Sequence, residues 1–304
     1  MTRRVRLIFN ARAHRGHAWE TASALRAIAA QYPEAEWAPT EYPSHATELA
    51  IQAAEQGYDS VAAIGGDGTA NEVINGLMRF PPERRPALAL VPTGSGNDFS
   101  CAVGISPDSA AAMHRVFTGT PRWIDLGQVT DGSGRTQYFG NALGIGFDAN
   151  VTFHSYRITY LHGFSIYLWA VIQTIILNHN APRMSLTMDG QRTDEEALLL
   201  TFCNGRREGG GFVVAPDAVP DDGLLQYTLV RKVSRPMMFR LIPEFMKGTH
   251  GRFKQVRLGT FRQVELKSDR PLTIHIDGEV FAGFDSNVLE LKVQVVPASL
   301  QVIV

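Results

Sequence analysis

Apolar positions in the first 130 residues follow a strand-then-helix rhythm. Short apolar runs at residues 5–9, 61–64 and 87–91 have the length and composition of buried parallel strands. Residues 18–30 and 45–55 instead place apolar side chains at helical spacing, and residues 36–40 offer a further strand. This alternation predicts an α/β domain built on a parallel sheet.

From about residue 128 the pattern changes to short apolar runs separated by turn signals. Asp189-Gly190 and Asp277-Gly278 each lie between two such runs, which is the usual signature of a two-residue hairpin turn. We therefore expect an antiparallel β-sandwich over residues 131–297, with an apolar helix near 161–177 inserted. Residues 1–130 would form the first domain, and residues 298–304, with a last strand at 300–304, can complete it. The expected strands of the second half are 138–145, 184–188, 197–203, 224–230, 263–266, 272–276 and 288–296.

The stretch from Ser60 to Gly76 carries the densest functional signal. A buried strand ends at Gly65, Gly66, Asp67 and Gly68, and a helical pattern follows from Ala70. The spacing of Thr69 and Glu72 predicts a capping box with Thr69 as N-cap, just as Ser44 is expected to cap the helix at 45–55. A helix N-terminus beside a loop without bulky side chains is an anion site, most often for phosphate.

The glycines could instead serve only the backbone freedom of a tight turn. Asp67 argues against that interpretation, because a carboxylate beside a phosphate is repulsive unless a cation such as Mg²⁺ lies between them. The loop therefore favours a nucleotide together with a metal ion.

A second loop of small residues, 92–100, follows the next predicted strand and contains Asp98. The carboxyl ends of parallel strands share one edge of a sheet, where ligands bind in open α/β folds, so both loops are expected to face one site. A helix N-cap is the alternative role for Asp98. Asp125, within Trp123-Ile-Asp-Leu-Gly127, is a third candidate acid.

Composition narrows the class of protein. The 304 residues are 44% hydrophobic and 19% charged with a net charge of −1, without the basic excess of a nucleic-acid binder. Cys101 and Cys203 are too few for a disulfide framework, which fits a reducing cytoplasm. The apolar segment 161–177 contains four polar positions, so a core or interfacial helix is expected rather than a membrane span.

Two places in the second half could carry chemistry. Asp221 and Asp222, with neighbouring carbonyls, could hold a hard cation, although a plain turn explains the same pattern. Asp277 and Glu279 flank Gly278. Asp277 is explained by the hairpin turn, whereas Glu279 has no role in a turn and could act as a base.

Taken together, these motifs resemble the diacylglycerol kinase catalytic domain family, which includes sphingosine and ceramide kinases. The matching residues cover nearly the whole chain in the family's order, most closely like the soluble bacterial lipid kinases. They are Gly65-Gly-Asp-Gly-Thr69, Asn71, Glu72, Asn75-Gly76, Pro92-Thr-Gly-Ser-Gly-Asn-Asp-Phe99, Thr40, His45-Ala46, Asp125-Leu-Gly127, Gly144-Ile-Gly-Phe-Asp148, 209–225 and Asp277-Gly-Glu279.

The resemblance implies a Rossmann-like nucleotide domain similar to those of phosphofructokinases and NAD kinases, a β-sandwich second domain, and ATP in the cleft between them. Asp67, Asp98 and Asp125 would organise the catalytic Mg²⁺. Glu279, supported by Asp277, would deprotonate the lipid hydroxyl. The ATP contacts would come from Asn10, Thr40, Gly65, Gly66, Asp67, Gly68, Thr69, Ala70, Asn71 and Thr93, and a structural Mg²⁺ from Val219, Asp222 and Leu224.

One loop departs from the family pattern. The first loop of the family usually reads Asn-Pro-x-Ser-Gly, whereas residues 10–16 here read Asn-Ala-Arg-Ala-His-Arg-Gly. Asn10 and one glycine remain, while the proline and serine are lost. The phosphate contacts of this loop are the least secure part of the resemblance.

The expected activity is phosphoryl transfer from ATP to a lipid hydroxyl, which needs positioning, a cation and a base aimed at the nucleophile. The acceptor could be diacylglycerol, a long-chain base, a glycolipid or a prenol, and segment 160–177 could supply part of an apolar cleft. NAD kinase activity and a non-catalytic regulator that binds nucleotide or lipid are the alternatives. The expected partners are a lipid at the membrane surface, reached by peripheral contact, and a second copy of the chain.

Overall fold

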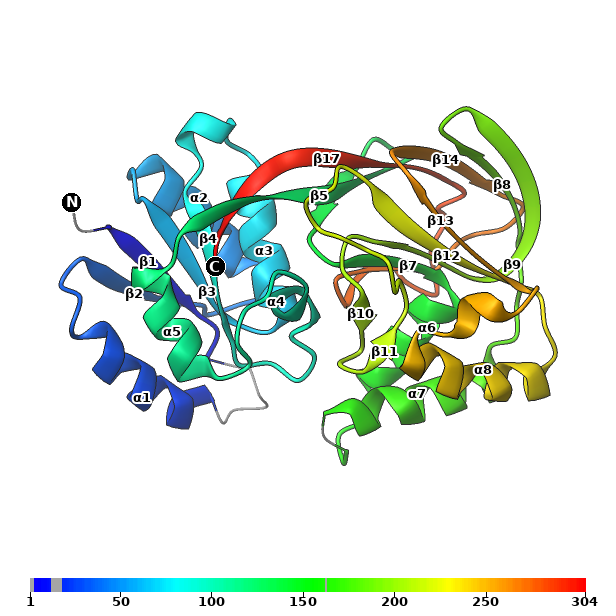
Figure 1. Ribbon diagram of the computed structural model, residues 1–304, viewed down its shortest axis with the longest axis horizontal. Helices are drawn as coiled ribbons and strands as arrows, with labels where there is room; N and C mark the ends of the chain where they lie inside the picture. Colours follow the sequence, from blue (N-terminus) through cyan, green and yellow to red (C-terminus); the bar gives the residue numbers. More distant parts are fainter. Residues whose placement is uncertain (1–2, 12–17, 162) are drawn as a thin grey trace. The chain divides into compact units, whose positions relative to one another are not determined.

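The protein is described by a computed structural model that covers residues 3–11, 18–161 and 163–304. Most of the unusual first loop, from Arg12 to His17, lies outside the described residues. The chain divides into two compact units, Met1–Asp125 with Ala298–Val304, and Leu126–Pro297. The first is a mixed α/β unit and the second an antiparallel β-sandwich, as the sequence predicts (Figure 1).

A parallel sheet forms the centre of the first unit. Its strands are β1 (Val5–Phe9), β2 (Ala35–Pro39), β3 (Ser60–Gly65) and β4 (Ala87–Pro92). They lie in the order β2-β1-β3-β4, and Val302 of β17 (Glu290–Ile303) pairs beside Leu88 of β4. Strands β3 and β4 are buried along their whole length, which explains their uninterrupted apolar sequences.

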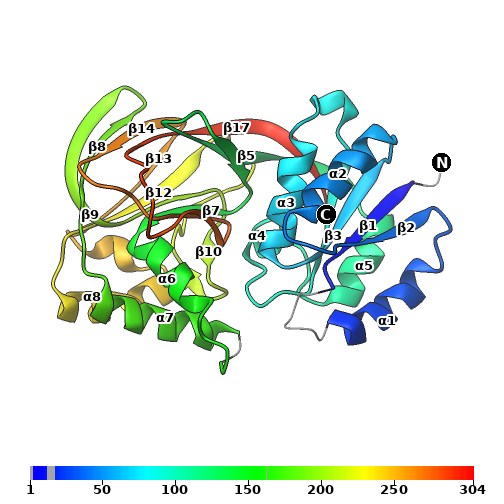
Figure 2. The ribbon, with the colours of Figure 1, turned by 180° about the vertical axis from the view of Figure 1, so that it is seen from behind.

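Helices cover both faces of this sheet. Helices α2 (His45–Glu55) and α3 (Asp67–Leu77) pack together on one face, and α1 (Ala18–Ala29) and α5 (Ser109–Thr118) on the other (Figures 1 and 2). A 3-10 turn, η2 (Pro82–Arg84), precedes β4, and the short helix α4 (Asp98–Ala102) follows β4. This arrangement buries the apolar stripe of each helix against the sheet.

The predicted capping box is wrong. Helix α3 begins at Asp67 with Gly66 as its N-cap residue, so Thr69 lies inside the first turn. Glu72 caps the neighbouring helix instead, because its carboxylate accepts from the backbone N–H groups of Ser44 (2.9 Å) and Ala46 (3.1 Å). Ser44 makes no side-chain cap bond and has a φ of 67°. Ser44 is therefore the N-cap residue of α2, as expected, but the side chain that accepts at this end of the helix is Glu72 of the adjacent helix.

The second unit is a sandwich of two sheets joined by the long strand β9. The first half of β9 pairs with β8, and its second half with β7 and β12. The residues that face inward form one apolar core that includes Phe139, Phe202 and Phe261. The strands are β5 (Pro121–Asp131, starting in the first unit), β6 (Thr136–Phe139), β7 (Ala142–Gly146), β8 (Arg183–Met188), β9 (Gln191–Cys203), β10 (Arg207–Glu208), β11 (Phe212–Val213), β12 (Leu225–Arg231), β13 (Val256–Phe261), β14 (Gln263–Ser268), β15 (Ile274–Ile276) and β16 (Glu279–Ala282).

Both predicted hairpin turns are confirmed. Asp189-Gly190 joins β8 to β9 and Asp277-Gly278 joins β15 to β16, and all four residues have positive φ. Positive φ at both central positions defines the type I′ turn, whose twist matches the flanking strands. Three expected strands differ. The segment 138–145 is divided into β6 and β7, and the strands expected at 288–296 and 300–304 are one continuous β17.

Three helices share a second apolar cluster in this unit. Helices α6 (Phe147–Ser155), α7 (Phe164–Leu177) and α8 (Arg235–Lys247) pack with residues of β9, β12 and β13, and η3 (His250–Arg252) follows α8. Helix α7 is the apolar segment expected near 161–177. Among the described residues, no helix has both the length and the apolar character needed to cross a membrane.

The cap that Glu72 provides leads to a stability prediction. Replacing Glu72 with Ala should lower the free energy of unfolding by about 1 kcal/mol, because two N–H groups at the start of α2 lose their acceptor. Urea unfolding followed by circular dichroism measures the change. Glu83→Ala, at an exposed position of η2, is the control, and an equal effect of both variants would contradict the assignment.

Candidate functional site

A candidate site of the first unit lies where the strand order of the parallel sheet reverses. Asn10 follows β1 and the Gly65–Gly68 loop follows β3, and these two strands are adjacent. Ligands of open α/β sheets bind at such a switch point, outside the carboxyl ends of the strands. Asn10 Nδ2 donates to Thr69 Oγ1 at 3.0 Å, and Thr40 N–H, at the end of β2, donates to the Phe9 carbonyl at 2.9 Å.

The structure brings the two glycine loops together. A Cβ added to Gly94 would lie 2.5 Å from the Cα of Gly66, so the backbones touch at a distance that side chains would prevent. Thr93 N–H donates to the Gly65 carbonyl (2.9 Å), and Phe99 N–H donates to Asp67 Oδ1 (3.1 Å). Asp67 therefore helps to fix the second loop, a role that its position in the sequence did not reveal.

The residues of this edge fit a phosphate group. Gly66, the N-cap residue of α3, has no side chain to cover the first turn, and Ala70 N–H is the first to bond within the helix, to the Gly66 carbonyl (3.1 Å). Thr93 Oγ1 is buried and has no hydrogen-bond partner among the described residues. A buried hydroxyl without a partner is costly, so a ligand oxygen would be a favourable addition.

The three acids expected to organise Mg²⁺ are placed differently. Asp98 begins α4 and is 6% exposed, while Asp125 is 3% exposed and accepts from the Ala298 N–H at 2.8 Å. Within residues 3–11, 18–161 and 163–304, the one cluster of three metal-ligating side chains contains none of these acids. The magnesium network of Asp67, Asp98 and Asp125 therefore stays a prediction.

A separate candidate site, in the second unit, is the turn between β15 and β16. Asp277 is 6% exposed, and its carboxylate accepts from three backbone N–H groups, those of Gly140 (2.8 Å), Asn141 (2.9 Å) and Ala142 (2.9 Å). Its own N–H donates to the Ala142 carbonyl at 2.8 Å. Asp277 thus fixes the turn to the corner between β6 and β7.

Glu279 is the exposed acid of this turn. The Tyr156 hydroxyl, at the end of α6, donates to the Gly278 carbonyl. Desolvation of the Tyr156 hydroxyl and the nearby charge of Glu279 raise the pKa of Tyr156. A fixed backbone that presents an accessible carboxylate is the geometry that a general base needs.

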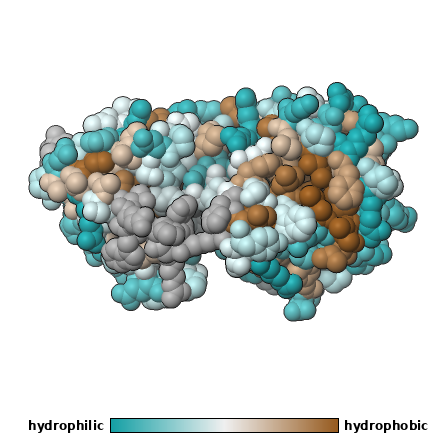
Figure 3. Space-filling model, turned by 90° about the horizontal axis from the view of Figure 1, so that it is seen from below, coloured by the Kyte–Doolittle hydropathy of each residue, from teal (hydrophilic) through white to brown (hydrophobic). Residues whose placement is uncertain are grey.

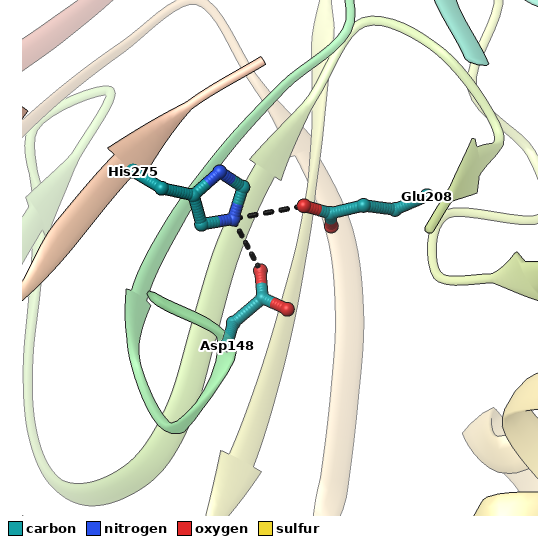
Figure 4. A group of neighbouring side chains, drawn as sticks. All are labelled: Asp148, Glu208 and His275. Atoms are coloured by element: carbon teal, nitrogen blue, oxygen red, sulfur yellow. Dashed lines mark hydrogen bonds and ion pairs between the residues drawn. The ribbon is translucent and has the colours of Figure 1, made fainter. Parts of the chain in front are cut away.

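Beneath the turn lies a buried charged cluster that sequence reasoning missed. His275 Nε2 lies 2.8 Å from Glu208 Oε1 and 3.1 Å from Asp148 Oδ2 (Figure 4). Burial lowers the pKa of His275, but the two carboxylates outweigh burial and raise that pKa to about 10. Asp148 lies in a motif that the sequence singled out, but nothing local connects it with His275.

The expected structural metal site lies in the loop before β12. Asp222 is exposed, and its Oδ1 accepts from the Leu224 N–H at 3.0 Å. This hydrogen bond forms an Asx turn, which is the alternative to a metal site that the sequence allowed for these residues. The set of Val219, Asp222 and Leu224 stays a prediction.

Comparison with known proteins gives the family. Residues 4–129 match the diacylglycerol kinase catalytic domain, and residues 141–304 match the YegS C-terminal NAD kinase beta sandwich-like domain. A diacylglycerol kinase of Mycobacterium tuberculosis is 31% identical over 262 residues, which cover 85% of this chain and 81% of that protein. The chain belongs to the diacylglycerol kinase family.

Solved structures support the fold of this lipid kinase. A diacylglycerol kinase from Bacillus anthracis str. Sterne superimposes with a TM-score of 0.78 at 23% identity, covering 99% of this chain and 97% of that one. Yeast NADH kinase in complex with NADH gives a TM-score of 0.54 at 10% identity, covering 99% and 83%. Membership in the family makes the protein a phosphotransferase that uses a nucleotide.

The raised pKa of His275 predicts a pH dependence of the kinase's stability. The folded state holds this proton more tightly than the unfolded chain, so the stabilisation is complete below pH 6.5 and is lost as the pH rises towards 10. The free energy of unfolding of the wild type should fall over this range by on the order of 2 kcal/mol more than that of His275→Gln.

Urea titrations at several pH values measure this difference. His114→Gln, at an exposed position of α5, should follow the wild type. Parallel curves for the wild type and His275→Gln would contradict the role assigned to the two carboxylates.

Proposed function

We propose that this lipid kinase transfers the γ-phosphoryl group of ATP, with Mg²⁺, to the hydroxyl of a diacylglycerol-like lipid. The observation that carries the proposal is the Asp277-Gly278-Glu279 turn. One carboxylate is fully used in fixing the backbone, and the next is exposed on it. A general base must be held in a fixed position relative to the hydroxyl that it deprotonates, and a rigid turn with an exposed carboxylate provides this.

The nucleotide would bind at the glycine loops of the first unit. The backbone N–H groups of Gly66 to Thr69 at the start of α3 would face its phosphates, and Thr93 Oγ1 would donate to one of them. Asn10, Thr40, Ala70 and Asn71 would shape the rest of the site. Bound Mg²⁺ would neutralise charge on the phosphates, with Asp67, Asp98 and Asp125 as its carboxylate support.

Glu279 would then remove the proton from the lipid hydroxyl as its oxygen attacks the γ-phosphorus, the bond from phosphorus to the bridging oxygen breaks, and ADP leaves. Asp277 cannot share this task, because its two oxygens already accept three N–H groups. Val219, Asp222 and Leu224 would hold a second, structural Mg²⁺ that orders the loop before β12.

An apolar surface on the second unit is consistent with a lipid substrate. Trp169, Ile176 and Leu177 of α7 are 40%, 58% and 65% exposed, and Phe239 and Met246 of α8 are 43% and 41% exposed. Figure 3 shows hydrophobic side chains gathered over this helical side of the unit. We propose that this face makes peripheral contact with the membrane surface, from which the acceptor would be taken. A cytoplasmic location and a homodimer stay predictions.

Phosphoryl transfer to a defined lipid tests the assignment of the base. Purified protein with labelled ATP, Mg²⁺ and diacylglycerol in mixed micelles should produce labelled phosphatidic acid. Glu279→Gln should lower kcat by about 100-fold or more, because general-base catalysis contributes on that order. Asp285→Asn, an exposed acid in the loop after β16, is the matched control. Equal activity of Glu279→Gln and the control would remove Glu279 from the mechanism.

The contact between the glycine loops gives a separate prediction for the nucleotide. Gly94→Ala forces a Cβ to 2.5 Å from the Cα of Gly66, so the loops must move apart. ATP affinity measured by titration calorimetry should fall about tenfold or more, since small displacements of phosphate donors are costly. Gly132→Ala is the control: it tests the cost of replacing a loop glycine where an added Cβ makes only an ordinary contact, 3.7 Å from Glu290 Cβ. Unchanged affinity in Gly94→Ala would contradict binding at these loops.

A further inference from the structure

The buried cluster of His275, Asp148 and Glu208 connects three elements to the turn that carries Glu279. His275 lies on β15 opposite Gly144 of β7 and is fully buried. A Cβ on Gly144 would lie 2.0 Å from Asp148 Oδ2 and 2.2 Å from His275 Nε2. Position 144 must therefore be glycine for the ring and the carboxylates to meet.

The two ring nitrogens of His275 face different partners. Nε2 faces Asp148 at the start of α6 and Glu208 on β10 (Figure 4). Nδ1 accepts from the Gly278 N–H at 3.3 Å. Gly278 is thus fixed at its N–H by His275 and at its carbonyl by Tyr156, and it immediately precedes Glu279.

The contact with Gly278 determines where protons can reside in the cluster. A ring that accepts at Nδ1 carries its hydrogen on Nε2, which then donates to the carboxylates. An additional proton on Nδ1 would face the Gly278 N–H, so the carboxylates are the more favourable place for it. Interacting groups titrate as a unit, so the proton behind the raised pKa of His275 is shared by all three side chains, and it resides on a carboxylate while Nδ1 accepts from Gly278.

The same tautomer argues against a metal ion at this place. A metal bound at Nε2 would need the lone pair of that nitrogen and would move the hydrogen to Nδ1. With a hydrogen on Nδ1, this nitrogen could no longer accept the hydrogen bond from the Gly278 N–H. The cluster is therefore best explained by hydrogen bonds between its own groups and the turn.

We propose that His275 is a positioning residue of the kinase, whose ring, oriented by Asp148 and Glu208, fixes the backbone that presents Glu279. This inference rests on the proposed function. His275 does not touch the reacting atoms. It acts through Gly278, and the carboxylates act through His275.

Two substitutions separate the two nitrogens. In His275→Asn, the side-chain oxygen can take the place of Nδ1 and accept from Gly278, while the partner of the carboxylates is lost. In His275→Gln, the longer side chain can donate to the carboxylates in place of Nε2, while the acceptor for Gly278 is lost. His114→Asn and His114→Gln are the controls.

The positioning role predicts opposite orders for activity and stability. kcat should fall about ten- to 100-fold in His275→Gln, because a reacting group displaced by about 1 Å loses on that order, and kcat of His275→Asn should lie closer to the wild type. KM for ATP should stay unchanged in both. Stability should instead be lower in His275→Asn, which removes the ring N–H that the two partly buried carboxylates accept. Equal losses of kcat, or a kcat order that follows stability, would overturn the proposal.

A spectroscopic measurement tests the contact independently of activity. The imidazole ¹⁵N spectrum of the wild type at the assay pH should show Nδ1 without a proton, and this signal should be absent in both variants. A ring protonated at both nitrogens would overturn the proposal. Absence of transfer by the wild type would reject the proposed function, whereas wild-type transfer with equal losses in the variants would reject the positioning role alone.

Discussion

The turn that carries Glu279 depends on one buried carboxylate. Asp277 accepts from three consecutive backbone N–H groups at the corner between β6 and β7, and these bonds are inaccessible to water. Bonds to an ionised acceptor are about twice as strong as neutral ones. Without them the Asp277-Gly278 turn would keep its pairing through β15 and β7, but it would lose its attachment to the corner between β6 and β7. The position of Glu279 depends on this attachment together with the bonds of Gly278 to His275 and Tyr156.

Two acids of the first unit that are expected to support Mg²⁺ also accept hydrogen bonds from the backbone. Asp67 accepts from the Phe99 N–H and Asp125 from the Ala298 N–H, so each fixes a loop or strand of the sheet edge. The glycine loops can touch because neither Gly66 nor Gly94 has a side chain. A carboxylate that already orders the backbone costs little additional entropy when it supports a ligand. Substitution of such residues therefore changes folding and binding together, and amide variants are more informative than alanine.

The sequence predicted the elements with strong local patterns. Strand β1 and helix α2 have the expected bounds. Both Asp-Gly turns form as expected, because a two-residue type I′ turn requires positive φ at both positions and Asp-Gly tolerates it. The cap at Thr69 failed, since Glu72 reaches a neighbouring helix that local spacing cannot reveal. His275 was missed for a similar reason. Asp148 precedes it by 127 residues, and a single histidine in an apolar strand gives no sign of charge. The glycine at position 144 was the available signal, because it leaves room for both side chains.

We propose a lipid hydroxyl as the acceptor, on a fold that also resembles an NADH kinase. The most direct measurement offers labelled ATP and Mg²⁺ to the purified protein with a total lipid extract and NAD in the same reaction, and separates the products by chromatography. We expect label in a lipid and none in the dinucleotide. Label in the dinucleotide alone would contradict the account.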